Sequence, residues 1–184
     1  MLWDYGSNCK ASCAVSCPPG WERAGDHCFF WSQERKNWIE AAETCKKRYN
    51  SHLASVTSQS IHDYMMSKKK QVWIGGTDLN TRGKWVWTDC SVWNLHSGWK
   101  QGEPSGMHPD HGQPEHCMEY LRIAEGTRND YHYSYLWNDK WCFREQEFVC
   151  SKIICAGEKQ NKNYNHSMLE LALQRIKQQS SNGV

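Results

Sequence analysis

The spacing of apolar positions changes along the chain, following first the helical period and later the strand period. Apolar side chains recur at helical spacing between residues 38 and 49, and Asn37, just before them, is a residue type that caps helix N-termini. A second segment of this kind follows Ser58, another capping residue. The pattern predicts two helices, the first running to about Tyr49. The apolar positions are Trp38, Ala41, Ala42 and Cys45 in the first helix, and Ile61, Tyr64 and Met65 in the second.

Short apolar or alternating segments predict strands elsewhere in the chain. A turn at residues 25–26 separates two short strands that would place Cys17 opposite Cys28. Residues 53–56 form a connector or a short strand. Residues 88–113 are irregular, and irregular segments of this length inside a compact domain are usually functional or disordered. The other predicted strands are residues 72–76, 84–87, 118–121, 136–137 and 147–150.

Composition narrows the class of protein and of partner. With 184 residues the chain can bury one full-sized core, and its net charge of +2 gives no argument for nucleic-acid binding. The basic run at residues 68–70 is interpreted as a solvated helix end. No apolar run approaches the length of a membrane span. The sequence has no Gly-x-Ser-x-Gly, no His-Glu-x-x-His and no phosphate-binding glycine loop, so we do not expect an enzyme.

Cysteine usage predicts the redox compartment. The even number and mostly wide spacing of the cysteines are typical of a disulfide framework, which forms in oxidising compartments. We therefore expect a secreted, extracellular protein. The ten cysteines are Cys9, Cys13, Cys17, Cys28, Cys45, Cys90, Cys117, Cys142, Cys150 and Cys155.

The two ends of the chain differ from its middle. We expect an N-terminal extension with extra cysteines at residues 1–16, a compact domain at 17–155, and a polar linker with a short amphipathic helix at 156–184. That helix, at residues 167–178, is either a frayed or docked tail or a self-association element. Asn165-His166-Ser167 is an N-glycosylation sequon, which predicts a glycoprotein.

Oxygen-bearing side chains gather in the irregular segment and in the strand that precedes Cys142. Carboxylate, amide and hydroxyl oxygens are hard donors, and they suit Ca²⁺ with its roughly six to eight ligands better than Zn²⁺. Three nearby histidines, His108, His111 and His116, are interpreted as exposed loop residues rather than zinc ligands. The sequence therefore predicts one hard-cation site between a loop and a strand. Its candidate ligands are Glu103, Ser105, Glu115, Asn138 and Asp139.

Several motifs in combination give the chain a family resemblance over residues 17–155. They are Cys17 with Cys28, Cys45, Trp73-Ile74-Gly75-Gly76, Trp85-Val86-Trp87-Thr88-Asp89, Glu103-Pro104-Ser105, Glu115-His116-Cys117, Trp137-Asn138-Asp139 and Cys150. With these the chain resembles the C-type lectin-like domain family, and most of all its secreted single-domain members of venom-lectin and fish-lectin type. The resemblance implies an α+β fold in which two helices flank small antiparallel sheets with a long irregular binding loop.

The resemblance also implies three disulfides, Cys17–Cys28, Cys45–Cys150 and Cys117–Cys142. The other four cysteines lie outside the common pattern, and their pairing stays open. Cys155 is expected to bond to Cys9 or Cys13. Cys90 is then left to pair with the remaining one or with a second chain.

The function that the resemblance implies is calcium-dependent carbohydrate binding. The five candidate ligands would coordinate one Ca²⁺ ion and hydrogen-bond two sugar hydroxyls that bind the same ion, with Glu103–Pro104 in the cis form. Ser105 replaces an Asn of the family motif, which we expect to weaken calcium binding. Of the family's auxiliary calcium site only Asp78 is kept, because Arg82 and His116 stand where further acids would be, so we expect one ion.

The sugar and the partner are less narrowly defined. Glu103 favours mannose, glucose or fucose, whereas the long loop is a galactose-type trait, with Met107 near the place of the galactose-type Trp. The alternative function is a binding module that uses the same fold for a protein, a mineral or an ice surface, and Ser105 favours it. A homodimer or higher oligomer through a spare cysteine or the tail helix is expected to cluster sites.

Overall fold

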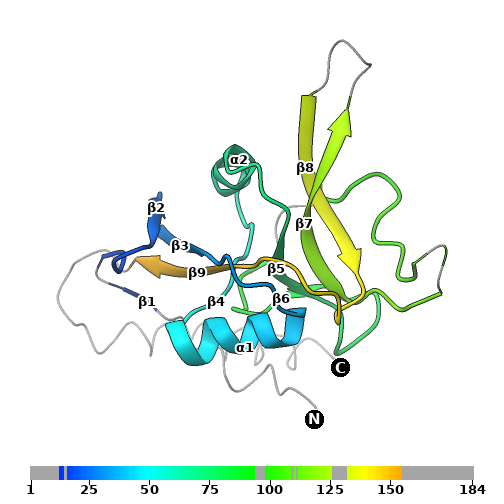
Figure 1. The fold of residues 1–184 in the computed structure, drawn as a ribbon, viewed down its shortest axis with the longest axis horizontal. Coiled ribbons are helices and arrows are strands. Elements are labelled where there is room, and N and C mark those ends of the chain that lie inside the picture. Colours follow the sequence, from blue (N-terminus) through cyan, green and yellow to red (C-terminus); the bar gives the residue numbers. More distant parts are fainter. Residues whose placement is uncertain are drawn as a thin grey trace, which may run out of the picture.

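The fold consists of two sheets flanked by two helices (Figure 1). The computed structural model describes residues 13–14, 16–93, 98–108, 110, 112–125 and 132–154 of the chain. In the first sheet the strand order is β1-β9-β3-β2, with β4 also paired to β9; in the second it is β6-β5-β7-β8. The first sheet contains β1 (Cys13–Ala14), β2 (Glu22–Ala24), β3 (His27–Trp31), β4 (His52–Leu53) and β9 (Val149–Ile154). The second contains β5 (Val72–Thr77), β6 (Val86–Trp87), β7 (Cys117–Glu125) and β8 (His132–Lys140).

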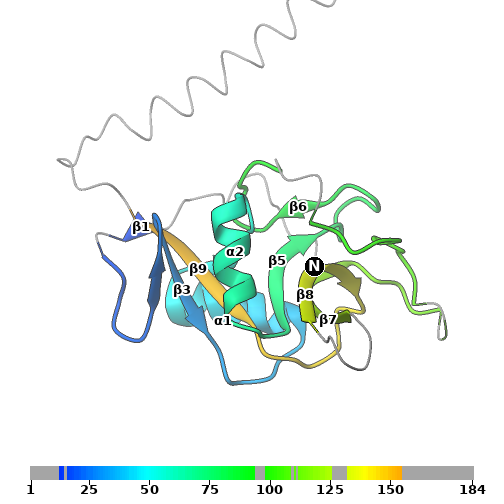
Figure 2. The same ribbon diagram turned by 90° about the horizontal axis from the view of Figure 1, so that it is seen from above.

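Both predicted helices are confirmed together with their caps. Helix α1 (Trp38–Tyr49) begins after Asn37, whose side chain accepts a hydrogen bond from the Glu40 N–H. Helix α2 (Gln59–Ser67) begins after Ser58, which accepts from the Ile61 N–H in the same way. Figure 1 shows α1 below the sheets and α2 above β3 and β9, and in Figure 2, seen from above, α2 lies in front of α1.

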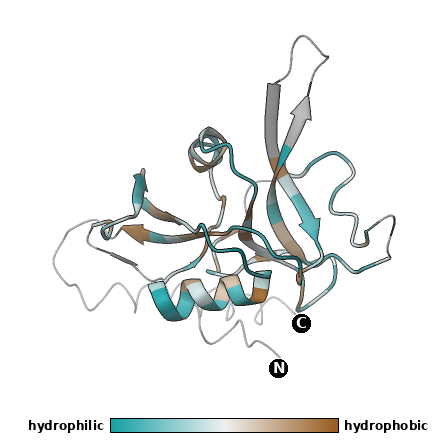
Figure 3. Ribbon diagram, viewed as in Figure 1, coloured by the Kyte–Doolittle hydropathy of each residue, from teal (hydrophilic) through white to brown (hydrophobic). Residues whose placement is uncertain are grey.

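Each helix buries one face against a different part of the sheets. From α1, Trp38, Ala41 and Cys45 pack in a cluster with Trp73 and Phe148. The last turn of α1 carries Lys46, Lys47 and Arg48 and is hydrophilic in Figure 3, which suits the negative end of the helix dipole. Ile61 and Met65 of α2 join the second cluster, whose members include Phe29, Val72, Tyr120, Trp137 and Val149. Neither helix of the described part has the length and apolarity needed to cross a lipid bilayer.

The strand predictions are confirmed in place but not always in extent. Strand β6 is only two residues long, and β7 and β8 each extend to nine. Strand β1 lies in the segment predicted as an extension, and it pairs in parallel with β9. Cys17 does not stand opposite Cys28, whose cross-strand partner is Arg23. The prediction failed there because the chain turns between Pro18 and Trp21, where the Trp21 N–H donates to the Pro18 carbonyl at 3.0 Å.

The three disulfides implied by the resemblance are present. Cys17 bonds to Cys28, Cys45 to Cys150 and Cys117 to Cys142. The second ties α1 to β9, and the third ties the start of β7 to the turn after β8. Cys90 is disulfide-bonded as well. The pairing expected for Cys9, Cys13 and Cys155, the tail helix and the sequon lie outside the described residues and side chains.

Candidate functional site

The loop that carries the first predicted ligands is held directly against β8. The Lys100 N–H donates to the Trp137 carbonyl at 2.9 Å, and the Trp137 N–H donates to the Gly98 carbonyl at 2.6 Å. Gly98 is needed for this approach, because a Cβ atom there would lie 2.3 Å from the Trp137 ring. The loop is therefore fixed to the strand that carries Asn138 and Asp139.

The turn at Glu103 directs its side chain back to the loop. Glu103–Pro104 is a cis peptide, as the resemblance implied. The Glu103 carboxylate accepts a hydrogen bond from the Ser105 N–H at 2.9 Å, and Lys100 Nζ lies 3.5 Å from its other oxygen. Its side chain is largely buried, 14% exposed.

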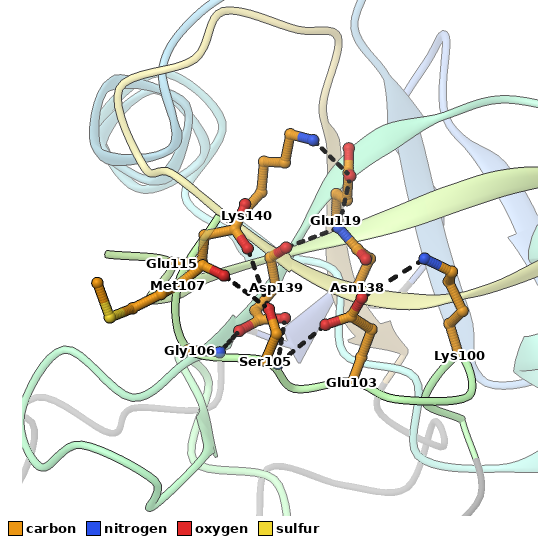
Figure 4. A network of polar contacts seen from close by, with 10 residues as sticks. All are labelled: Lys100, Glu103, Ser105, Gly106, Met107, Glu115, Glu119, Asn138, Asp139 and Lys140. Carbon is orange, nitrogen blue, oxygen red and sulfur yellow. Dashed lines mark hydrogen bonds and ion pairs between the residues drawn. The ribbon is translucent and has the colours of Figure 1, made fainter. Parts of the chain in front are cut away.

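Asp139 is buried beneath the same turn. Its carboxylate accepts from the Ser105 N–H at 3.1 Å and from the Gly106 N–H at 2.6 Å, as Figure 4 shows. Both carboxylate oxygens accept hydrogen bonds from backbone N–H groups. The residue is 0% exposed. Two N–H groups stabilise a buried negative charge, but they do not neutralise it.

Glu115 completes the acidic side of the site. Its Oε2 lies 3.2 Å from Ser105 Oγ, which also lies 3.3 Å from the Met107 carbonyl, so the single hydroxyl proton faces these two acceptors. The Glu115 N–H donates to the Gly106 carbonyl at 3.1 Å. Ser105 thus contacts three carboxylates: those of Glu103 and Asp139 through its N–H, and that of Glu115 through its hydroxyl.

Asn138 is held from the opposite side by a buried carboxylate. Asn138 and Glu119 are direct cross-strand partners in β8 and β7. Asn138 Nδ2 donates to Glu119 Oε1 at 3.0 Å and to the Asp139 carbonyl at 2.6 Å. Both contacts use the amide nitrogen, so Oδ1 is the atom that remains to accept a hydrogen bond or to ligate an ion.

The crowding of carboxylates changes their acidity. Burial raises the pKa of Asp139 to about 6; the Gly106 and Ser105 N–H groups oppose this rise, and the Glu103 carboxylate adds to it. Burial also raises the pKa of Glu115, and the charge of Asp139 adds to that rise. Burial acts in the same direction on Glu103, but hydrogen bonds from Asp139 and Ser105 and the charge of Lys100 outweigh it, so the pKa of Glu103 is lowered. Without a cation, the Glu103–Asp139 pair therefore keeps a proton on Asp139 below about pH 6.

The donor set fits a hard cation, but its present arrangement is not a coordination sphere. Carboxylate, amide and hydroxyl oxygens are the ligands that Ca²⁺ prefers. In the described part of the chain, no three His, Cys, Asp or Glu side chains are already spaced to hold a metal ion. Each Asp139 oxygen accepts one backbone hydrogen bond and keeps a second lone pair that could bind an ion.

Asp78, the one acid of the auxiliary calcium site that the sequence keeps, is hydrogen-bonded to His116 and to the backbone. Asp78 is buried, with one oxygen 2.8 Å from His116 Nδ1 and the other accepting from the Gly83 N–H at 2.7 Å. Arg82 reaches the Gly106 carbonyl at 3.5 Å. His116 is therefore a partner of Asp78 and not the exposed loop residue predicted from sequence. His108 is partly buried, and His111 lies outside the described residues.

Sequence reasoning did not single out Glu119. It is fully buried and accepts from Gln71 Nε2 at 2.9 Å, with Lys140 Nζ 3.9 Å from its other oxygen. A signal was present, because an acid between Met118 and Tyr120 interrupts a predicted strand. Its partners could not be read from the chain, since Gln71 belongs to a distant segment.

The chain is similar to known proteins that contain a lectin C-type domain. The model of the lectin C-type domain matches residues 34–152. A protein named "Lectin" from Pleurodeles waltl is 31% identical over 146 residues, covering 75% of this chain and 77% of the relative. The galactose-specific lectin nattectin from Thalassophryne nattereri is 29% identical over 154 residues, covering 80% and 87%.

Solved structures of the same fold include sugar-recognising and other proteins. The carbohydrate-recognition domain of the mouse scavenger receptor C-type lectin matches with a TM-score of 0.62 and 27% identity, covering 77% of this chain and all of that one. A calcium-independent type II antifreeze protein matches with a TM-score of 0.59 and 26% identity, covering 77% and 98%.

Proposed function

Because the chain belongs to the lectin C-type domain family, we propose that it binds carbohydrate through one Ca²⁺ ion. The proposed ligands of the ion are Glu103, Ser105, Glu115, Asn138 and Asp139. The bound sugar would also receive hydrogen bonds from these side chains.

The observation that carries this proposal is the convergence of three carboxylates on one turn. Glu103, Glu115 and Asp139 all contact Ser105 or its neighbour Gly106. In the described part, the cations that act on these three carboxylates are monovalent: Lys100, 3.5 Å from Glu103, and Lys140, through its charge on Glu115. Like charges brought together under burial are unfavourable unless a cation joins them. A divalent cation would supply the missing positive charge.

Under this proposal, different residues of the site bind the sugar hydroxyls and position the ligands of the ion. When bound, the ion supplies two coordination positions for adjacent sugar hydroxyls. The carboxylates of Glu103 and Glu115 can accept hydrogen bonds from those hydroxyls, and the Ser105 hydroxyl can donate one in place of its bond to Met107. Lys100 positions the Glu103 carboxylate without entering the ion's ligand set.

For the sugar we propose a mannose-type ligand, and galactose remains the second choice. Glu103 acts as an acceptor, as in mannose-type sites, and Ser105 keeps a donor in the loop. The galactose-specific relative and the length of the loop favour the second choice. Met107, which is 47% exposed beside Ser105, offers an apolar contact to either sugar.

A second candidate function is binding without calcium to a protein, mineral or ice surface. The specific observation in its favour is that both Asp139 oxygens already have backbone donors. The calcium-independent antifreeze relative shares the fold. Under this candidate, the Ser105–Gly106 turn would keep its present hydrogen bonds in the working protein.

Affinity chromatography separates the two candidates. The protein is loaded on mannose-agarose and galactose-agarose with millimolar calcium, and then eluted with a chelator. Retention that the chelator releases supports the calcium-dependent lectin, and the resin that retains more protein identifies the sugar type. Equal elution with and without calcium on both resins would overturn the calcium-dependent lectin function.

Replacing one ligand tests whether the site is correctly placed. Glu115→Gln keeps the size of the side chain and removes its charge, so both the calcium-induced rise in Tm and the sugar retention should be lost. Glu43→Gln, on the exposed side of α1, is the matched control and should behave as wild type. An unchanged calcium effect in Glu115→Gln would mean that the ion binds elsewhere.

We further propose that the protein acts outside the cell, where its disulfides persist, and that it self-associates. Association would use the helix expected at residues 167–178, because none of the described cysteines is free to form the expected link to a second chain. Analytical ultracentrifugation with and without a reducing agent tests this proposal. A monomer under both conditions would contradict it.

A further inference from the structure

Glu119 is a buried carboxylate to which the proposed ligand set gives no role. It lies on β7 between the core residues Met118 and Tyr120 and is 0% exposed. Burying an ionised carboxylate is strongly unfavourable unless hydrogen bonds and a cation stabilise it. An apolar residue at this position would avoid that cost.

Three side chains surround this carboxylate, two from β8 and one from the residue just before β5. Asn138 Nδ2 donates to Oε1 at 3.0 Å, Gln71 Nε2 donates to Oε2 at 2.9 Å, and Lys140 Nζ lies 3.9 Å from Oε1. Figure 4 shows Lys140 and Asn138 both directed at Glu119. Within the described residues the carboxylate is thus paired with one cation and two amide donors.

The contacts with Glu119 and with the Asp139 carbonyl together determine which way the Asn138 amide faces. The two ends of an amide have nearly the same size, so packing alone does not distinguish the oxygen from the nitrogen. An ionised carboxylate only accepts hydrogen bonds, so the end that faces Glu119 must be the nitrogen. The oxygen then faces away from Glu119, and an oxygen attracts a cation, whereas an NH₂ group would repel it.

We propose that Glu119 is a positioning residue that fixes the Asn138 amide with its oxygen available to the cation. This inference rests on the proposed calcium site and names a residue outside its ligand set. Lys140 compensates part of the Glu119 charge, and Gln71 restrains the other carboxylate oxygen. Residues behind a ligand that orient it in this way typically change metal affinity by about 10- to 100-fold when replaced.

The decisive experiment compares the same replacement in two backgrounds by calorimetric titration of calcium. Glu119→Gln replaces one of the two groups that only accept from Asn138 Nδ2 with a group that can also donate, and leaves the Asp139 carbonyl as the other. The amide should then turn more readily, and calcium affinity should fall by about 10-fold or more. In an Asn138→Asp background, the side chain carries an oxygen both toward Glu119 and toward the ion. The orientation of the side chain at position 138 therefore no longer affects calcium binding. There, Glu119→Gln should raise the affinity, because it removes the repulsion between the two carboxylates.

Two further variants separate positioning from charge. Glu119→Asp keeps the charge but shortens the side chain. A positioning role predicts weaker calcium binding in this variant, and a purely electrostatic role predicts no change in calcium affinity. Glu147→Gln breaks a comparable ion pair, with Lys70 at 2.7 Å, and should leave calcium affinity unchanged. Near-ultraviolet circular dichroism of each variant verifies that it is folded.

A metal-free measurement tests the orientation directly. In calcium-free protein, the side-chain NH₂ signals of Asn138 should be distinct and slow to exchange in nitrogen–proton spectra, and Asn138→Asp identifies them by their loss. Glu119→Gln should remove that protection. If wild-type protein takes up no calcium, the proposed function fails; if it does and Glu119→Gln binds within twofold of wild type, only the positioning role is overturned.

Discussion

Ser105 is the residue that forms hydrogen bonds to all three acidic side chains of the site. Its N–H contacts Glu103 and Asp139, and its hydroxyl contacts Glu115. The hydroxyl is a short donor that is already directed at protein acceptors, so as an ion ligand it is weaker than the amide carbonyl of Asn. Ser105 therefore sets the strength of the proposed calcium site without deciding whether the site exists.

Ser105→Asn should strengthen calcium binding. An amide oxygen reaches further than a hydroxyl, and one improved neutral contact of about 1 kcal/mol corresponds to roughly fivefold in affinity. Calorimetric titration of wild type and variant with calcium measures the difference. Ser60→Asn, the same change on α2, should leave the affinity unaltered. A weaker Ser105→Asn protein would show that the hydroxyl, not its replacement, suits the ion.

The acidity of Asp139 predicts how stability depends on pH in calcium-free protein. Its pKa is raised to about 6 by burial and by Glu103, and the pKa of Glu115 is raised too, so the folded state holds these protons more tightly than the unfolded state. That contribution is complete below the ordinary carboxyl pKa and is lost as pH rises through about 6. Tm should therefore fall over this range without calcium, and the rise in Tm on adding calcium should be larger at pH 7.5 than at pH 5.

Thermal unfolding of desalted protein at several pH values, with and without calcium, measures both effects. Asp139→Asn removes the acid with the larger rise in pKa and should flatten the calcium-free profile. A calcium-induced rise in Tm that is equal at pH 5 and pH 7.5 would show that the ion does not compete with these protons.

At the scale of elements, short-range signals predicted more than long-range ones. The caps Asn37 and Ser58 and the apolar positions after them gave both helices, because a helix is determined by residues within a few positions of each other. The pairing of β1 with β9 was missed, because parallel pairing joins segments far apart in sequence and leaves no local pattern. The extent of β8 was also missed, because its length follows from pairing with β7 along nine residues.

The cap of α1 gives a prediction at this scale. Asn37→Ala removes the acceptor for the Glu40 N–H at 2.9 Å and should lower the free energy of unfolding by about 1 kcal/mol. Urea denaturation measures this change. Asn37→Asp, which keeps an acceptor, should lose much less. Calcium affinity should not change in either variant, because α1 packs against β4, β5 and β9 in the described part of the chain.

The site shows the same division between local and distant information. Five candidate ligands could be proposed from sequence because they lie in motifs of the resembled family. The cis peptide at Glu103 was expected from the same resemblance. Three features could not be predicted: the backbone donors on Asp139, the Asp78–His116 pair and the support of Asn138 by Glu119. Each depends on how strands and loops from different parts of the chain are brought together.

For the whole molecule, the disulfides differ in how much of the chain they constrain. Cys45–Cys150 spans 105 positions, and Cys17–Cys28 spans 11. In the loop-entropy model, closing loops of these lengths corresponds to about 5 and about 3 kcal/mol, respectively. The long link joins α1 to β9, so it connects the two ends of the domain core.

Replacing each pair with alanines tests this difference. The Cys45→Ala/Cys150→Ala protein should be less stable than Cys17→Ala/Cys28→Ala by about 2 kcal/mol in denaturant unfolding. Both half-cystines of the longer link are fully buried and its alanines would also leave small cavities, which acts in the same direction. Greater stability of the Cys45→Ala/Cys150→Ala protein would contradict the model.

The pairing of β1 with β9 has a consequence for how the molecule can be attached to something larger. Cys13 stands beside Ile153, so the chain enters and leaves the described fold at neighbouring points. Figure 1 shows these two strands on the side away from β7 and β8. The loop of the site is hydrogen-bonded to β8. A copy tethered by either flank to a stalk, a bead or a sensor chip would keep the proposed sugar-binding turn pointed outward, and under that proposal an array of copies could engage a glycan-coated surface together.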